Sequence, residues 1–261
     1  MHPILFELGP LSLRSYGLLV ALAFYSGLQL ARWAAHRRGI SDVFILDLCL
    51  VLILSGLLGA RLFYVALNAT YFLSKPWDIF KVWEGGLVFY GGFLGAAAAG
   101  VFFARLRHQS VGIVADCIAP ALALGQAVGR LGCFFAGCCY GRPTTHFWAI
   151  QFKDPAALAP LGIDLHPVQL YESALCLALA AGLWLLFKRY PKSNGRVFWI
   201  YVIAYGVLRF FLEGFRGDDR GRVLAGLQPS QWVALIAIVV GSGVLSTLHS
   251  SKKEGHLESS H

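Results

Sequence analysis

The chain has 261 residues, of which 57% are hydrophobic and only 14% are charged, with a formal net charge of +8. A soluble domain carries about 25% charged residues, so this composition excludes an ordinary water-soluble domain. The positive charge does not require a nucleic-acid partner, because the basic loops of membrane proteins contact anionic lipid headgroups. We therefore expect a membrane protein that binds no nucleic acid.

Apolar stretches recur along the chain, each close to the roughly 20 helical residues that cross a hydrocarbon core. The first lacks a basic leader and a cleavage site, which indicates a retained span. We predict an all-α, polytopic fold with one transmembrane domain over residues 1–248 and a polar, disordered tail over 249–261. The predicted spans, about seven in number, are 15–33, 44–66, 86–106, 113–131, 168–188, 196–215 and 230–248.

Lysine and arginine are densest in the short segments that follow the first, third, fifth and seventh spans. Because basic loops stay on the cytoplasmic side, this distribution predicts an outside N-terminus and an inside C-terminus. The basic residues assigned to the inside are Arg32, Arg37, Arg38, Arg105, Arg107, Lys188, Arg189, Lys192, Arg196, Lys252 and Lys253.

Three arginines, Arg61, Arg130 and Arg209, fall inside or at the ends of spans, where an unpaired guanidinium costs several kcal/mol. In "YGVLRFFLEGFR", Glu213 and Arg216 follow Arg209 at i+4 and i+7, which predicts one shared helix face. The arrangement fits either an internal Arg209–Glu213 pair or an anion site. Arginine suits a phosphate, because its planar fork donates two hydrogen bonds and stays charged in a dry site.

Two glycine pairs occur in "KVWEGGLVFYGGFLG", which leads into the third span. Glycine allows a backbone to approach another backbone or a ligand closely. The pairs Gly85-Gly86 and Gly91-Gly92 therefore predict either helix packing or a ligand contact.

Three of the six cysteines lie together in "GRLGCFFAGCCYGRPT". Their C-x4-C-C spacing matches no common zinc pattern, so we expect no metal site. The predicted topology places Cys133, Cys138 and Cys139 outside, where disulfides form and persist. A disulfide or reactive thiol is one interpretation, and packing of small residues around a turn is the other.

An ordered series of motifs carries a family resemblance. "KVWEGGLVFYGGFLG", "ADCIAPALALGQAVGRLGCFFAGCCYGRP", "HPVQLYES" and "YGVLRFFLEGFRGDD" resemble, in this order, the bacterial prolipoprotein diacylglyceryl transferases. With "GARLFYV" near the second span, the similarity covers most of residues 10–225. It implies a seven-helix inner-membrane enzyme that needs no cofactor. Such enzymes join the diacylglyceryl group of phosphatidylglycerol to the lipobox cysteine of a preprolipoprotein through a thioether, and glycerol 1-phosphate leaves.

The resemblance also implies roles for individual residues. Arg130 and Arg209 match the two key arginines and would hold the lipid phosphate, while Glu213 would orient Arg209. Asp116 and Glu172 also match polar positions of the family, where a structural role and a functional role fit equally well. The remaining positions expected around phosphatidylglycerol are Tyr16, Arg61, Gly141 and Cys133.

This chain departs from the family pattern at several positions. Tyr90 replaces the histidine often proposed as base, and a tyrosine with an ordinary pKa of about 10 is a poor base at neutral pH. Tyr90 stays a candidate catalytic residue by position. Cys133, Ala136 and Cys138 stand where the family usually has Asn, Asn and Glu. The alternative is therefore a membrane protein of this fold without transferase activity, which binds phospholipid or acts in thiol redox chemistry.

Overall fold

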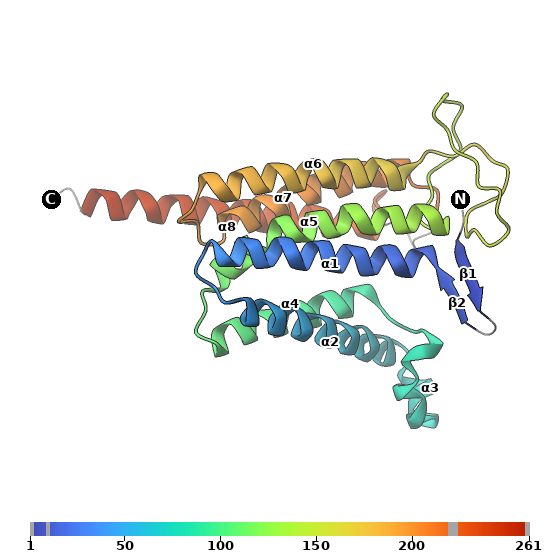
Figure 1. Ribbon diagram of the computed structural model, residues 1–261, viewed down its shortest axis with the longest axis horizontal. Coiled ribbons are helices and arrows are strands. Elements are labelled where there is room, and N and C mark those ends of the chain that lie inside the picture. The colour runs from blue at the N-terminus through green and yellow to red at the C-terminus, as the bar shows by residue number, and fades with distance from the viewer. Residues whose placement is uncertain (1–2, 9–10, 219–223, 259–261) are drawn as a thin grey trace. The chain divides into compact units, whose positions relative to one another are not determined.

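The computed structural model describes residues 3–8, 11–218 and 224–258 (Figure 1). Within this part of the chain, seven helices are long and apolar enough to cross a membrane, as the sequence predicts. These helices are α1 (Ser15–His36), α2 (Asp42–Leu67), α4 (Phe89–Leu106), α5 (Val111–Ala136), α6 (Val168–Arg189), α7 (Arg196–Leu212) and α8 (Pro229–Glu258).

The helix boundaries agree with the predicted spans, with two informative differences. Helix α5 continues past the predicted end at residue 131 to Ala136, so Arg130 and Cys133 lie within its last turns. Helix α8 is assigned through Glu258, beyond the predicted end at residue 248. Residues 259–261 of the predicted polar tail lie outside the described residues, and the separate tail stays a prediction.

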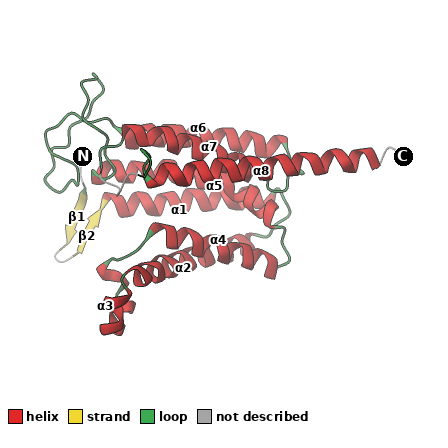
Figure 2. Ribbon diagram, turned by 180° about the vertical axis from the view of Figure 1, so that it is seen from behind, coloured by secondary structure: helices red, strands yellow, loops and turns green. Residues whose placement is uncertain are grey.

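A short β-hairpin precedes the first helix and is absent from the sequence prediction. Strands β1 (Ile4–Leu8) and β2 (Leu11–Arg14) pair antiparallel (Figure 2). The backbone N–H and the hydroxyl of Ser15 both donate to the Pro3 carbonyl, at 3.0 and 3.2 Å. These bonds tie the hairpin to the start of α1. The sequence did not reveal these strands, because four or five residues next to a long apolar run are too few to show the alternation of apolar and polar residues that marks a β-strand.

The chain divides into two compact units, which we describe separately. The first unit comprises residues 1–31 and 115–261, and the second comprises residues 32–114. Most of α1, nearly all of α5 and the whole of α6, α7 and α8 belong to the first unit. Helices α2 and α4 and the short helix α3 (Ala69–Ser74) belong to the second.

The second unit is held together by glycine contacts between α2 and α4. A Cβ atom at Gly91 would collide with the Cβ of Phe63 and the carbonyl oxygen of Gly59, and one at Gly95 would lie 2.7 Å from the Ser55 carbonyl oxygen. Side chains at these positions would push the helices apart, as expected for small-residue packing in membranes. Gly91 therefore serves helix packing, which is one of the two predicted interpretations.

In the first unit, α5 carries buried polar contacts to its neighbours. The carboxylate of Asp116, fully buried, accepts hydrogen bonds from the backbone N–H groups of Gly195 and Phe198, each at 2.9 Å. These are donors at the start of α7 that have no partner within the helix. The Ser173 hydroxyl on α6 donates to the Ala127 carbonyl at 2.8 Å. Helices α6 and α7 are thus both attached to α5 by hydrogen bonds.

The connection from α5 to α6 forms a small folded segment rather than an open loop. Phe152, Ala159 and Leu165 make a buried core. Isolated β-bridges join Pro143 and Ile150 to Leu165, and Gly141 to Arg216. The last bridge brings the residues after α5 against the residues after α7.

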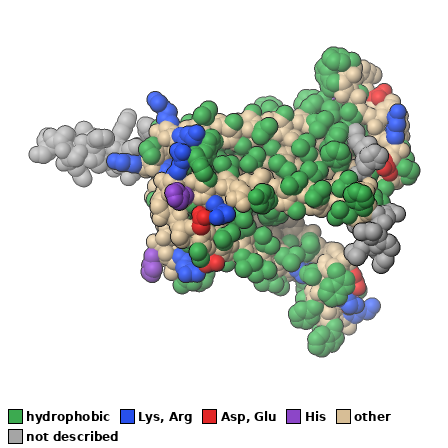
Figure 3. Space-filling view, viewed as in Figure 1, with side chains coloured by type: hydrophobic (Ala, Val, Ile, Leu, Met, Phe, Trp, Pro, Cys, Tyr) green, Lys and Arg blue, Asp and Glu red, His purple; other side chains and the backbone are tan. Residues whose placement is uncertain are grey.

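Hydrophobic side chains cover much of the helical surface of both units in the space-filling view, whereas charged side chains gather near helix ends (Figure 3). A surface of this kind would be unfavourable in water, and it suits contact with lipid. The chain is a multi-pass membrane protein.

Candidate functional site

The first charged pair of the candidate site joins α5 to α6. Arg130 Nη2 lies 2.9 Å from Glu172 Oε1, and the Glu172 side chain is 1% exposed. The Tyr205 hydroxyl on α7 donates to the same oxygen at 3.2 Å. A buried carboxylate stays ionised only with such partners, so Glu172 and Arg130 neutralise each other inside the helix bundle.

The second pair lies at the end of α7. Arg209 Nη2 is 2.6 Å from Glu213 Oε2, at i,i+4, and both side chains are buried. The approach lacks hydrogen-bond geometry, and neither terminal nitrogen of Arg209 has a hydrogen-bond partner among the described residues. The internal pair that we predicted is present, yet Arg209 keeps donors that an anion could use.

Tyr205 connects the two pairs. Its hydroxyl contacts Glu172, and it lies within electrostatic reach of both Arg130 and Arg209. These four side chains come from three helices, α5, α6 and α7. The structure therefore brings the two predicted arginines to one place, around a residue that we did not single out. Tyr205 precedes Arg209 by one helical turn, and that spacing is a signal that could have identified it.

Arg216 does not lie on the helix face that we predicted for it. Helix α7 ends at Leu212, a 3-10 turn covers Glu213–Phe215, and Arg216 is extended with φ −78° and ψ 144°. Its guanidinium forms two 2.8 Å hydrogen bonds to Asp218. The periodic pattern was misleading here, because the chain leaves the α-helical path between Glu213 and Arg216.

Gly141 occupies a position where only glycine fits. A Cβ atom there would collide with the carbonyl oxygen and Cβ of His166. The flanking backbone is paired with the segment after α7, since Arg142 N–H donates to the Phe215 carbonyl at 2.8 Å and Gly217 N–H to the Tyr140 carbonyl at 3.1 Å. The absence of a side chain at Gly141 thus lets the segment after α5 approach His166, just before α6, closely.

The three neighbouring cysteines gather at the C-terminal end of α5. The Sγ atoms of Cys133, Cys138 and Cys139 all lie within 4.8 Å of one another. Arg130 Nη1 lies 3.9 Å from Cys133 Sγ, so the thiols border the first arginine pair. Gln169, which is 1% exposed, donates from Nε2 to the Cys138 carbonyl at 2.8 Å and holds the turn in place. We noted Gln169 only as part of a motif.

Electrostatics distinguish the thiols of the turn. Hydrogen bonds from Cys133 and Cys138, together with the charge of Arg216, lower the pKa of the Cys139 thiol far below its ordinary value. Hydrogen bonds that Cys138 donates to Cys133 and Cys139, together with burial, raise the pKa of Cys138. Burial opposes the charge of Arg216, but hydrogen bonds to Asp218 and Cys139 raise its pKa. The pKa of Cys139 is thus lowered next to a cation, Arg216, that favours the ionised form of a thiol.

Tyr16, at the start of α1, borders the same region. A Cβ atom at Gly132 would lie 3.4 Å from Cδ2 of Tyr16, so the ring packs against α5 close to Cys133. Tyr16 also lies within electrostatic reach of the three thiols and of Arg130. Of the predicted site residues, Tyr16, Arg130, Cys133, Gly141, Arg209 and Glu213 all belong to the first unit.

Arg61 and Tyr90 belong to the second unit, where their contacts are local. Arg61 is buried and donates to backbone carbonyls of the segment between α3 and α4, including Ile79 at 2.8 Å and Gly85 at 2.7 Å. Its guanidinium therefore holds that segment in place. Tyr90 opens α4, is 42% exposed and packs edge to face with Phe89. Roles of Arg61 and Tyr90 toward a lipid stay predictions.

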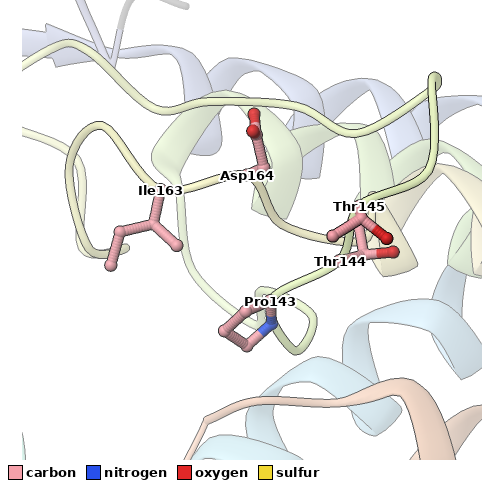
Figure 4. A pocket seen from close by; sticks show the side chains of 5 residues that line it. All are labelled: Pro143, Thr144, Thr145, Ile163 and Asp164. Carbon is pink, nitrogen blue, oxygen red and sulfur yellow. The ribbon is translucent and has the colours of Figure 1, made fainter.

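A surface pocket of about 490 Å³ lies in the connection between α5 and α6 (Figure 4). Its lining contains none of the predicted site residues. Its one carboxylate, Asp164, accepts a hydrogen bond from Gln151 at 2.9 Å. The pocket therefore lacks the paired cations that distinguish the arginine site, which we keep as the candidate functional site. The residues that line the pocket are Pro143, Thr144, Thr145, Ile163 and Asp164.

The fold and the site together define a class: a multi-pass helical membrane protein with two arginine–carboxylate pairs buried near the ends of its helices. The particular family follows from comparison with known proteins. The family model described as prolipoprotein diacylglyceryl transferase matches residues 3–247. The chain belongs to that family.

Relatives in several bacteria carry the name phosphatidylglycerol–prolipoprotein diacylglyceryl transferase. The protein from Clostridium tetani is 37% identical over 92% of this chain and 95% of its own length. The one from Synechococcus elongatus is 39% identical over 92% and 84%, and the one from Geobacter sulfurreducens is 40% identical over 84% of each chain. These relatives place the chain among membrane proteins of bacteria.

Proposed function

We propose that this protein is a phosphatidylglycerol–prolipoprotein diacylglyceryl transferase. The observation that carries the proposal is the pair of arginines near Tyr205, the half-buried Arg130 and the buried Arg209, in a chain of this family. The substrates are phosphatidylglycerol and a prolipoprotein, as the names of the relatives indicate, and the family resemblance implies that the acceptor group is the lipobox cysteine.

The reaction makes one bond and breaks one. The acceptor thiol loses its proton, and its sulfur attacks the glycerol carbon that carries the phosphate ester. The carbon–oxygen bond breaks, its electron pair stays on the oxygen, and glycerol 1-phosphate leaves. No group is oxidised or reduced. The enzyme must therefore supply alignment, a thiolate, and stabilisation of the negative charge on the departing phosphate.

The arginine pairs suit that last task. Arg209 is buried and keeps terminal nitrogens without hydrogen-bond partners among the described residues. Arg130 is the more accessible of the two, with a side chain 19% exposed. A guanidinium held by a carboxylate on one edge can donate to phosphate oxygens from the other. Glu172 and Glu213 act as positioning residues that fix the two guanidinium planes.

Three of the remaining candidates belong to the same unit as this centre. Tyr16, Cys133 and Gly141 border it in the first unit, and we assign them to the binding of phosphatidylglycerol. Arg61 and Tyr90 keep their proposed parts in lipid binding and catalysis. We assign the protein to the bacterial inner membrane, as the family resemblance implies, with the N-terminus outside, because lysine and arginine are densest in the segments predicted to lie inside.

The alternative function is phospholipid binding without transfer. The cysteine substitutions beside Arg130 favour it, since they remove polar partners that the family usually has. Buried charge is costly in a membrane, and the two intact arginine pairs are easier to reconcile with an active site.

The first prediction tests the phosphate site with purified protein in detergent, phosphatidylglycerol and a lipobox peptide. Arg130→Ala and Arg209→Ala should each lose transfer by about a hundredfold or more, the scale of removing one preorganised donor. Arg209→Lys should also be strongly impaired, because a point charge cannot replace the fork. Thioether formation is measured by mass spectrometry of the peptide.

Arg107→Lys is the matched control, because Arg107 forms an exposed pair with Asp47 at 3.0 Å in the second unit. It should keep wild-type transfer. Near wild-type transfer by either alanine variant would refute the assignment of the arginines. If the wild-type protein neither transfers the lipid nor restores growth to cells depleted of their own transferase, the alternative function is correct.

A further inference from the structure

The end of α5 folds the three cysteines into one cluster. Cys138 N–H donates to the Cys133 carbonyl at 3.1 Å, and Gly137 N–H donates to the Phe134 carbonyl at 3.2 Å, while Gly137 has φ +70°. This is the Schellman arrangement, in which the residue after the glycine folds back over the last helical turn. Here it places Cys138 beside Cys133.

A second unusual backbone conformation adds the third thiol. Cys139 has φ +60°, in the left-handed region that residues other than glycine seldom adopt. Strain of this kind persists where the surrounding structure holds it. It turns Cys139 toward the other two cysteines instead of away from the helix end. Two left-handed residues within three positions therefore produce a cluster that the linear C-x4-C-C spacing does not reveal.

The distances between the three Sγ atoms suit a metal ion, although the C-x4-C-C spacing in the sequence did not indicate one. The three Sγ atoms lie within 4.8 Å of one another. Tetrahedral zinc with Zn–S bonds of about 2.3 Å separates its sulfur ligands by about 3.8 Å. Each Sγ–Sγ distance would have to shorten by at most roughly 1 Å for the three sulfur atoms to bind one zinc ion. Rotation about χ1 of the cysteines can supply a shift of that size. Thiolates are soft ligands that select Zn²⁺ and Cu⁺ over hard cations.

The charges around the cluster also fit. Three thiolates with one divalent ion carry a net charge of −1. Arg130 lies 3.9 Å from Cys133 Sγ, and the Arg216 guanidinium interacts with Cys139. Each of these arginines is also paired with a carboxylate, and their remaining donors can hold the thiolates from outside the ligand sphere. None of the six cysteines, all within the described residues, forms a disulfide.

We infer that Cys133, Cys138 and Cys139 form a three-thiolate site for one soft d10 cation, Zn²⁺, with its fourth coordination position left to an external ligand. This inference replaces our expectation from sequence that the chain has no metal site. Zinc with three protein ligands is the arrangement that keeps one position open for water or substrate.

The open position has a chemical use that rests on the proposed function. A thiol that coordinates zinc is deprotonated, and the acceptor substrate of the proposed transfer is a thiol. The lipobox cysteine would take the fourth position as a thiolate, with its proton released to water. The zinc keeps its oxidation state. This step supplies the thiolate in a chain that has Tyr90 where a basic histidine is expected.

The test uses the full-length protein, purified reduced in detergent and without phospholipid. We expect one zinc per chain by elemental analysis, and after exchange with Co²⁺ the visible absorption of a thiolate-rich tetrahedral site. Cys138→Ser and Cys139→Ser should lose both signals. Cys49→Ser is the matched control, because Cys49 lies on α2 in the second unit and should keep both. Thermal unfolding checks that each variant is folded.

Three outcomes would overturn the site: no zinc or Co²⁺ bound by the reduced protein, equal binding by folded Cys139→Ser, or maleimide counting that shows a disulfide in protein isolated without reductant. For the open position, a lipobox peptide should shift the Co²⁺ spectrum and a serine version should not. Unchanged transfer by zinc-depleted enzyme would refute the activating role while supporting the transferase function. Loss of transfer that Zn²⁺ restores would support both.

Discussion

At the scale of single residues, each arginine of the site is paired with one carboxylate and still has N–H donors that can bind a second group. Arg130 is fixed by Glu172, and Arg209 by Glu213, at 2.9 and 2.6 Å. A guanidinium has five donors in a rigid plane, so one carboxylate does not exhaust it. The pairs neutralise buried charge in the resting protein and leave donors for a phosphate.

Tyr90 carries a second prediction at this scale. Its side chain is 42% exposed, and its ring packs against that of the neighbouring Phe89. A tyrosine without a strong activating partner is a poor base. Tyr90→Phe should therefore keep transfer within about fivefold of wild type, a change of about 1 kcal/mol in the barrier, measured as kcat/KM for the lipobox peptide. A loss as large as that of Arg209→Ala would make the hydroxyl essential.

At the scale of secondary-structure elements, α5 organises the first unit. Its second turn carries the buried Asp116, a turn near its C-terminal end carries Arg130, and its last turn and the cap that follows present the three thiols. Side chains three or four residues apart share a helix face, so a single helix positions the structural and the functional groups together. A shift of α5 relative to α6 and α7 would therefore disturb both the Arg130–Glu172 pair and the thiol cluster.

Asp116 provides the prediction for this scale. Its carboxylate caps the start of α7, and Asp116→Ala would leave the N–H groups of Gly195 and Phe198 without it. Each buried donor left without a partner costs about 1–3 kcal/mol, so the free energy of unfolding should fall by at least that amount. Asp154→Ala is the control, since Asp154 accepts one exposed N–H, from Ala156, at 2.9 Å.

Unfolding of both variants in mixed micelles with increasing SDS measures the difference. The Asp154 variant should stay within about 0.5 kcal/mol of wild type, as exposed substitutions do. Equal stability of the two variants would mean that the Asp116 contact contributes nothing to the attachment of α7.

At the scale of the whole molecule, the chain forms two units, and different kinds of contact stabilise the interior of each. In the second unit, α2 and α4 meet through glycines, which allow close backbone contact in lipid. The first unit has buried polar bonds and ion pairs between α5, α6 and α7. Buried polar contacts between membrane-spanning helices thus join the helices of the unit that carries the arginine pairs, whereas the buried Arg61 of the second unit bonds to a connecting segment.

Orientation in the membrane is the prediction for the whole molecule. The positive-inside distribution predicts the N-terminus outside and the C-terminus inside. A green fluorescent protein fused after the last residue should fluoresce, and alkaline phosphatase fused there should be inactive. Alkaline phosphatase fused at Lys75, in the segment after α2, should be active and is the internal control. The reverse pattern at both points would invert the topology.

The sequence alone determined the features that depend on local composition and on chemistry carried by single residues. Seven spans follow from apolar runs of membrane length, since a helix satisfies its own backbone and lipid accepts its side chains. The motif order indicated the family, and the cost of buried charge identified Arg130 and Arg209. These arguments need no knowledge of which helices are neighbours.

The tertiary structure decided which residues meet. Glu172 rather than a neighbour in sequence is the partner of Arg130, and Tyr205 joins the two arginines, because helices far apart in the chain pack together. Periodicity misplaced Arg216, since a 3-10 turn ends the helix before it. The thiol cluster depends on φ angles at Gly137 and Cys139 that no residue spacing encodes. Contacts between distant segments and left-handed turns arise from packing, and only the folded chain specifies them.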